Sequence, residues 1–374
     1  MLTKTLQTSI HLLEPVLYLE SSQDTPTVLR GVVNLDLKKS RAIESLDVYF
    51  DGQLETQWIG SDSKCEQRRT NIAHQRIDLL RDTPGSASAL VLNSGKTRFG
   101  FEMELPEGLP ETVECPNIRV HYQVSAVVTF VNNRRILQTG KAPVKKTVQR
   151  SKTFVRLARL PFEDILLGEN YRALIDSRKH LSKWFQYHII IDKKAVALGT
   201  WLPVTVGLAP TVPGLRIMHF CLQVIERRSV CPDKWHTIQT CHMLQRACST
   251  DPQIPNCDLD EPWQGTIHYK VPDDRSLAHS TQRYSGFRVS HMLLISIMIS
   301  FPEKGALSLT KRGQRTITFQ TDIDLLDRSV GVLERNNAII LPSYDGPSPF
   351  TVRDMLFGNP DTSGIFPPAY HEIA

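Results

Sequence analysis

The chain has few cysteines for its length, and their spacing matches neither a disulfide framework nor a common zinc module. Its 374 residues contain seven cysteines, an odd number spread along the sequence. Five of them lie between Cys221 and Cys257, near His236 and His242, but no two cysteines are separated by two residues. The pattern favours reduced thiols, buried or in loops, and we assign no metal ligand.

Long apolar runs are missing as well. The longest, His291 to Phe301, is too short to cross a bilayer, and the first residues, Met1 to Thr8, contain no apolar signal core. These two absences predict a soluble intracellular protein.

The motifs of common catalytic sites are also absent. The sequence has no Gly-x-Ser-x-Gly, no His-Glu-x-x-His and no phosphate-binding glycine loop. The acidic pair Asp322 and Asp324 has the setting of a solvated surface, and His291 has no obvious partner. We therefore expect neither catalytic residues nor a cofactor, although groups on distant loops can still converge into a site.

Neither sign of charge dominates the chain. There are 44 Lys and Arg residues against 39 Asp and Glu, which gives a net charge of +5 and an isoelectric point near 8.8. Such a mild excess permits attraction to anionic membranes but is not typical of a nucleic-acid-binding protein. With 41% hydrophobic residues the chain can bury a core, and its length suggests two domains.

Apolar and polar residues alternate through most of the first 150 residues, as in strands with one buried face. The buried faces predicted for three strands are Val33, Leu35 and Leu37; Ile43, Leu46, Val48 and Phe50, with a shift after Ile43; and Val120, Tyr122, Val124, Ala126, Val128 and Phe130. Asp51-Gly52 predicts a hairpin turn, and residues 61–96 predict a long polar excursion with room for a short helix at Ile77 to Leu80.

The alternation resumes at residue 185. Further strands are predicted at Phe185–Ile191, Ile217–Glu226, Trp263–Val271, His291–Phe301 and Arg315–Leu325, with Met218, Phe220, Leu222 and Val224 on one buried face. Many strands with almost no helical periodicity predict an all-β protein of two immunoglobulin-like β-sandwiches in tandem. We place the sandwiches at residues 1–150 and 185–340, a linker at 151–184 and a flexible tail at 341–374.

Several segments resemble one known family, the α-arrestins, and most strongly its fungal members. In the first half these are residues 29–40, 43–52, 56–58, 99–113 and 120–126, in that order and spacing. In the second half the resemblance is looser and rests on residues 189–199 and on Ala338-Ile-Ile-Leu-Pro-Ser-Tyr344. The resemblance implies two arrestin-like sandwiches and an adaptor role.

The tail contains two proline–tyrosine motifs, Leu341-Pro342-Ser343-Tyr344 and Pro367-Pro368-Ala369-Tyr370. Consecutive prolines favour polyproline II, which WW domains accept in an aromatic groove with the tyrosine as a second anchor. Two weak sites on one chain also reinforce each other through effective concentration. The alternatives are an ordinary proline-containing terminus and, for Tyr344, the end of a last strand.

The resemblance and the tail together predict an adaptor that recruits a HECT-type ubiquitin ligase through its WW domains. Its other partners would be the cytosolic tails of plasma-membrane transporters or receptors, which are then ubiquitinated and endocytosed. The protein would be cytoplasmic and peripheral at the plasma membrane and endosomes. The alternatives are a retromer-like trafficking scaffold that recruits no ligase, and an enzyme or small-molecule binder built on β-sandwiches.

A basic stretch spans the end of the first predicted sandwich and the start of the predicted linker, before Leu160-Pro161-Phe162: Lys141, Lys145, Lys146, Arg150, Lys152, Arg156 and Arg159. One interpretation is a solvated last strand and linker, and the other is contact with anionic lipid or acidic receptor tails. The resemblance also implies that the adaptor is itself ubiquitinated, and Lys141, Lys145 and Lys146 are our candidate acceptors because they lie near a domain edge.

Thr250 is a candidate phosphorylation site. Arg246 lies four residues before it and Pro252 two residues after it, so phosphothreonine here would resemble a ligand of 14-3-3 proteins. An unmodified polar loop is the alternative.

Overall fold

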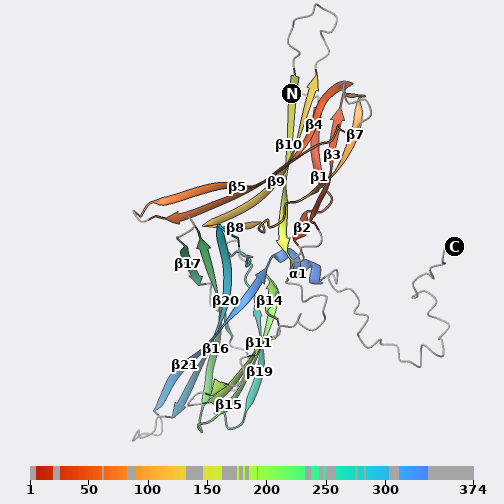
Figure 1. Ribbon diagram of the computed structural model, residues 1–374. Helices are drawn as coiled ribbons and strands as arrows, with labels where there is room; N and C mark the ends of the chain where they lie inside the picture. Colours follow the sequence, from red (N-terminus) through yellow and green to blue (C-terminus); the bar gives the residue numbers. More distant parts are fainter. Residues whose placement is uncertain are drawn as a thin grey trace, which may run out of the picture. The chain divides into compact units, whose positions relative to one another are not determined.

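The structure is a computed structural model of the 374-residue chain. It describes residues 6–19, 26–60, 63–81, 90–131, 146–161, 175–176, 180–181, 185–191, 193–231, 237–243, 247–249, 258–273, 277–281, 284–302 and 311–335. Within these residues the predicted all-β fold is confirmed: four sheets form two sandwiches, and one short helix is present (Figure 1). This helix has eight residues, and no helix of the described part is long and apolar enough to cross a membrane.

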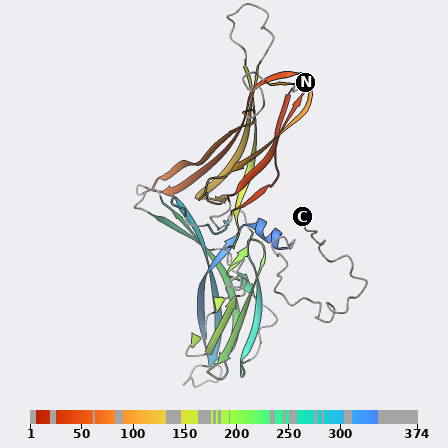
Figure 2. The ribbon, with the colours of Figure 1, turned by 45° about the vertical axis from the view of Figure 1, so that its right-hand side comes forward.

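The first sandwich consists of a small and a large sheet, drawn red to yellow in Figure 2. The small sheet has the order β1 (Leu6–Leu12), β3 (Val28–Leu37), β7 (Gly95–Glu104). The large sheet has the order β2 (Val16–Leu19), β10 (Lys146–Arg159), β9 (Ile118–Val131), β4 (Arg41–Ile59), β5 (Cys65–Asp78), with β6 (Leu90–Leu92) beside β4 and β8 (Val113–Cys115) beside β9.

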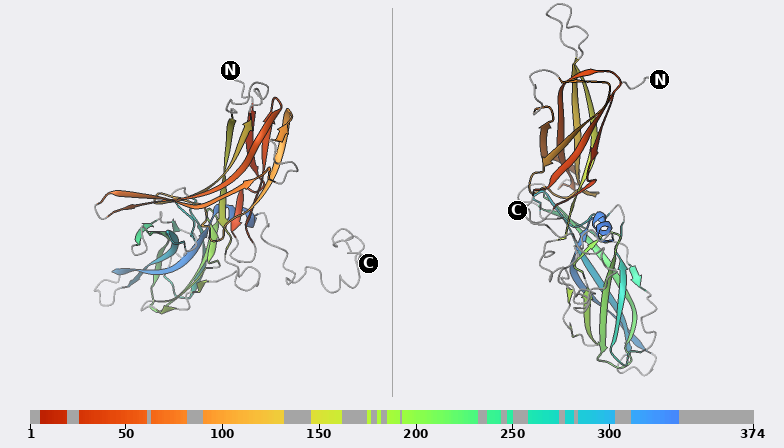
Figure 3. Two further views of the ribbon diagram at one scale, coloured as in Figure 1. Left: turned by 45° about the horizontal axis from the view of Figure 1, so that its top comes forward. Right: turned by 90° about the vertical axis from the view of Figure 1, so that its right-hand side faces the viewer.

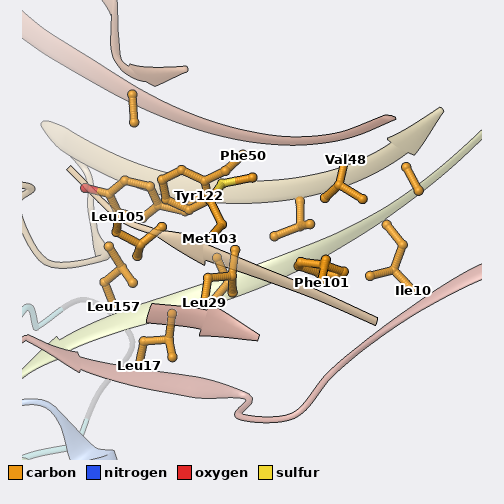
Figure 4. Close-up of a cluster of buried hydrophobic side chains, with 14 of the residues drawn as sticks. Ile10, Leu17, Leu29, Val48, Phe50, Phe101, Met103, Leu105, Tyr122 and Leu157 are labelled. Carbon is orange, nitrogen blue, oxygen red and sulfur yellow. The ribbon is translucent and has the colours of Figure 1, made fainter. Parts of the chain in front are cut away.

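The core of the first sandwich contains the residues that alternation predicted. All members of the three predicted buried faces are buried, and the register of β4 against β9 shifts between Ile43 and Ser45, where the sequence indicated a shift. Figure 4 shows the rings of Phe50 and Tyr122 together in this core; their centroids are 5.5 Å apart and nearly parallel. The buried Tyr122 hydroxyl donates a hydrogen bond of 2.6 Å to the Pro110 carbonyl oxygen, which satisfies its polar end.

Two local predictions for the first sandwich are wrong. Asp51-Gly52 is not a hairpin turn but lies inside β4, because a Cβ at Gly52 would come within 2.7 Å of the Tyr122 ring, and only glycine leaves room for it. Residues 65–78 are not a polar excursion or a helix but the long strand β5. At the edge of the sheet its alternation is weak, since most of its side chains are solvated.

The second sandwich also has two layers, drawn green to blue in Figure 3. One sheet has the order β11 (Ile175–Asp176), β13 (Phe185–Ile191), β15 (Trp201–Pro210), β19 (Trp263–Lys270), with β12 (His180–Leu181) beside β13. The other has the order β14 (Ala195–Ala197), β21 (Arg312–Leu326), β20 (Phe287–Pro302), β16 (Arg216–Val230), β17 (Ile238–Met243), with β18 (Ala247–Ser249) beside β16. Helix α1 (Arg328–Arg335) follows β21.

The five strands predicted after residue 185 are all present, with one error in their faces. Phe220, Leu222 and Val224 are buried, but Met218 is 47% exposed. A bulge in β16 between Ile217 and His219 inserts one residue and reverses the alternation on its amino-terminal side.

Strand β10 is longer than the sequence indicated. It pairs with β9 from Lys146 to Val155 and then runs parallel to β2 from Arg156 to Arg159. It therefore continues past residue 150, where we placed the end of the first domain. The division into domains at residues 150, 184 and 340 stays a prediction.

Candidate functional site

Most of the residues to which the sequence assigned a function lie outside the described residues. These are the WW-binding residues Leu341, Pro342, Tyr344, Pro367, Pro368 and Tyr370, the phosphorylation site Thr250, and two of the three ubiquitin acceptors, Lys141 and Lys145. The third acceptor, Lys146, begins β10, and its half-exposed ammonium lies 2.6 Å from Glu44 Oε1. The structural candidate for a site is instead a charged junction, where side chains of the two sandwiches contact each other.

Arg159, the last residue of β10, is the first element of this junction. Its guanidinium binds both oxygens of Asp324 on β21, with Nη2 to Oδ1 at 2.7 Å and Nη1 to Oδ2 at 3.0 Å, and its Nε donates to Glu111 Oε1 at 3.0 Å. Arg159 and Glu111 are almost completely buried. Burial lowers the pKa of Arg159, but the bonds to Asp324 and Glu111 outweigh it and leave the pKa raised, so the group stays charged.

Arg156, three residues earlier in β10 and on its opposite face, makes the second connection. It donates two hydrogen bonds to Asp327 Oδ2, of 2.5 and 3.0 Å. Asp327 Oδ1 accepts a bond of 2.9 Å from the backbone N–H of Ser329 and so caps helix α1. Burial raises the pKa of Asp327, but the Ser329 N–H and Arg156 outweigh it, and the pKa is lowered. The carboxylate therefore ties the first sandwich to the start of the helix.

A third group of charges lies inside the second sandwich. Glu226 and Arg228 on β16 and His291 on β20 are all buried. Glu226 accepts bonds from Arg228, from the Ala278 backbone N–H at 2.9 Å and from His291 Nε2 at 3.1 Å. Burial raises the pKa of Glu226, but these partners lower it overall, so the carboxylate is ionised.

The partners of His291 fix its tautomer. Its Nε2 faces the Glu226 carboxylate, which only accepts, and its Nδ1 lies 2.9 Å from Ser280 Oγ. Ser280 Oγ accepts the Leu325 backbone N–H, and when the ring proton is on Nε2 the Ser280 hydroxyl donates its own proton to Nδ1. Burial lowers the pKa of His291, and the ring is neutral with its proton on Nε2.

His279 and an apolar group complete the junction. His279 Nε2 is 3.0 Å from the Thr112 carbonyl oxygen and Nδ1 is 2.9 Å from that of Ser280. Both oxygens only accept, so an imidazolium makes both bonds and a neutral ring makes one. Four apolar side chains of the second sandwich join the core of the first: Val230, Ala278, Phe287 and Val289.

A pocket of about 600 Å³ opens beside the junction. Its three arginines, Arg119, Arg156 and Arg328, each lie within 4.0 Å of a carboxylate, so they leave little positive charge for a ligand. Burial raises the pKa of the Cys115 thiol in its wall, which makes that sulfur a poor nucleophile. No group of metal-ligating side chains occurs in the described residues. The ion pairs and apolar contacts of the junction are suited to holding the two sandwiches together.

Three interpretations of single residues are corrected by this geometry. Asp324 is not a solvated surface acid, because it is bonded to Arg159, and His291 does have a partner, Glu226. Arg159 is not a solvated basic residue. The burial of Arg159 could have been inferred from the sequence, because Arg159 occupies the same alternate positions of β10 as the buried Val155 and Leu157.

Comparisons with known proteins match the first sandwich to one protein family and most of the chain to fungal relatives. The family described as "Arrestin (or S-antigen), N-terminal domain" matches residues 24–151. An arrestin domain-containing protein of Schizosaccharomyces pombe is 24% identical over 341 residues, which covers 87% of this chain and 54% of that protein. A candidate arrestin-related trafficking adapter of the same organism is 24% identical over 234 residues, or 53% of this chain and 33% of that protein. The chain thus spans about half the length of the first relative and a third of the second.

Proposed function

Because this chain carries an arrestin N-terminal domain and its homologues are fungal arrestin-domain proteins, we propose that it is a trafficking adaptor that recruits a HECT-type ubiquitin ligase to membrane transporters or receptors. The sandwiches would contact the cytosolic tails of the cargo, and the tail would bind the ligase. Ubiquitination and endocytosis of the cargo would follow. The chemistry belongs to the ligase, so we assign no catalytic residue to this chain.

The observation that carries the proposal is the pair of proline–tyrosine motifs that follows the second sandwich in the sequence. Pro367 and Pro368 fix two successive residues in polyproline geometry before Tyr370, whereas Leu341 fixes none at the matching position before Tyr344. The motif at Tyr370 should therefore bind a WW domain more tightly than the motif at Tyr344.

Calorimetric titration of a WW domain into the full chain tests this ranking. An aromatic anchor typically contributes about 2 kcal/mol, or about thirtyfold in affinity. We expect Tyr370→Ala to lose about that factor and Tyr344→Ala to lose less, while the neighbouring substitution His371→Ala changes little. If the unsubstituted chain does not bind the WW domain, ligase recruitment is refuted and the scaffold without a ligase becomes the better account.

Three further assignments belong to the same proposal. The adaptor would work at the cytoplasmic face of the plasma membrane and endosomes. It would be ubiquitinated when the ligase docks, on Lys141, Lys145 or Lys146, and phosphorylation of Thr250 would create a 14-3-3 ligand. Persistence of the ubiquitinated band in the Tyr344→Ala/Tyr370→Ala double variant would separate that modification from docking through the tail.

A further inference from the structure

One row of side chains on β10 points out of the first sandwich and combines positive charge with apolar surface. It consists of Val148, Arg150, Lys152 and Phe154, which share a face because they alternate along the strand. Val148 and Phe154 are 56% and 72% exposed, while Leu157, of the opposite parity, is fully buried. We call these four residues the β10 row.

The positive charge of this row is not neutralised by its neighbours. Arg150 and Lys152 make no ion pair with any other described residue. Across the sheet, Arg150 is in register with Val127 on β9 and then with Asp47 on β4, so Asp47 shares its face. The acids of β4 on this face already bind β5: Asp47 with Arg76 at 2.8 Å, Asp51 with His74 at 2.7 Å, and Glu55 with Arg69 at 3.0 Å.

The sequence around the row strengthens this imbalance. From Pro116 to Phe162 the chain contains ten Lys and Arg residues and no Asp or Glu. The row therefore lies in a segment of uniformly positive charge, with two large apolar side chains exposed among the bases. A complementary partner must offer both negative charge and apolar groups, as an acidic peptide with apolar side chains or an anionic bilayer does.

The row lies on a face of the sheet, and this position favours a bilayer surface over an extended peptide. An extended peptide gains its affinity from ladder bonds at a sheet edge, and a peptide lying on a face forgoes them. Strand β1 of the small sheet also approaches β10, which leaves less room for an added strand. A bilayer surface needs no ladder bonds, because its phosphates pair with Arg and Lys while exposed apolar side chains enter the interface.

We propose that the β10 row docks on an anionic membrane surface. From Val148 to Phe154 the row covers roughly 20 Å at about 3.4 Å per residue, which is long enough to meet several lipid headgroups. A pocket of about 560 Å³ lies beside Phe154, and the Nδ1 atom of His121 in its wall is buried and forms no hydrogen bond within the described residues. A headgroup phosphate entering this pocket would give that ring nitrogen its missing partner.

Co-sedimentation of the full chain with phosphatidylcholine vesicles, with and without phosphatidylserine, tests the proposal. We expect binding only to the phosphatidylserine vesicles, and Arg150→Gln/Lys152→Gln to weaken it about ten- to thirtyfold at low salt. Phe154→Ser should weaken binding at low and high salt alike, because its contribution is not electrostatic.

Two matched controls remove the same groups elsewhere. Lys38→Gln/Lys39→Gln deletes two exposed charges after β3, and Ile59→Ser deletes a side chain that is 71% exposed at the end of β4. Both should bind within twofold of the unsubstituted chain, and an unchanged melting temperature should show that all variants are folded.

The proposal is overturned if the unsubstituted chain does not bind phosphatidylserine vesicles, or if the Lys38/Lys39 control loses as much affinity as the β10 variant. It is also overturned if a glutamate-rich peptide, and not the vesicles, requires Arg150 and Lys152, since the row would then be a peptide site. The outcome is independent of ligase recruitment, which the WW-domain titration measures on the tail.

Discussion

Arg150 and Arg159 belong to the same strand, β10, and their guanidinium groups have opposite surroundings. Arg159 is buried and bound to two carboxylates, whereas Arg150 is exposed and pairs with no described residue. Successive side chains of a strand point to opposite faces, so Arg159 shares the face of the buried Leu157, whereas Arg150 shares the face of the exposed Phe154. One strand can thus hold the second sandwich through residues at its carboxyl end, Arg156 and Arg159, and offer the exposed row before them to a partner.

The largest effect that would test this comparison is expected at Arg159. Arg159→Met keeps the length of the side chain but leaves Glu111 and Asp324 without their cation, and breaking such a buried pair typically costs about 3–5 kcal/mol. Urea unfolding of the full chain should show a loss of that size. Arg150→Met should change the free energy of unfolding by only about 0.5 kcal/mol.

A second substitution sharpens this test. Adding Asp324→Asn to Arg159→Met removes one of the uncompensated charges, so part of the lost stability should return. If Arg150→Met costs as much as Arg159→Met, the surroundings of these two arginines do not differ in the way that the geometry indicates.

A smaller effect is expected at Asp327, which pairs with Arg156 and caps helix α1. Asp327→Ala removes both roles and should cost about 2 kcal/mol in unfolding experiments, of which the cap typically accounts for about 1. The contribution of the ion pair is modest, because Arg156 is partly exposed to water. Asp327→Asn keeps an acceptor for the Ser329 N–H and should lose about half as much; an equal loss would mean that the cap contributes nothing.

The smallest effect is a pH dependence from the buried pair of Glu226 and His291. Burial holds the pKa of His291 below its ordinary value of 6.5, so below that pH the unfolded chain binds a proton that the folded chain refuses, and stability falls. The titratable groups that act on the ring are Glu226, Asp324 and His279, and Arg228 is bonded to Glu226. Below about pH 4.5, loss of the ionised Glu226, whose pKa is also lowered, should reduce stability further.

His291→Gln should remove the first part of this decline. Its side-chain amide can still donate to Glu226, but it does not titrate. Free energies of unfolding measured between pH 7 and pH 5 should therefore fall less steeply than in the unsubstituted chain. Identical slopes for the His291 variant and the parent chain would contradict a neutral buried imidazole.

Alternation in the sequence predicted most strands, because each has one face in a core. The prediction from alternation was wrong where a close contact or a bulge determines the local structure. Gly52 has the sequence context of a turn, but it makes room for the Tyr122 ring, and the bulge in β16 exposes Met218. Strand β5 escaped notice because an edge strand with solvated side chains has little alternation to detect.

The candidate site was harder to predict than the fold. Parity alone places Arg159, Glu226 and His291 on core faces, so their burial could have been inferred. Their partners could not, because Arg159 meets Asp324 across 165 positions of the sequence and Glu226 meets His291 across 65. The tail motifs are the reverse case: their chemistry is local and evident in the sequence, and they lie outside the described residues.

The most direct measurement compares the same substitution, Arg to Gln, at positions 150 and 159 of the full chain, with unfolding stability and phosphatidylserine-vesicle binding recorded for both. We predict that Arg150→Gln weakens vesicle binding at unchanged stability, and that Arg159→Gln lowers stability by about 3 kcal/mol or more. Equal losses of stability at the two positions, or vesicle binding that is indifferent to Arg150, would contradict the separate roles assigned to Arg159 and Arg150.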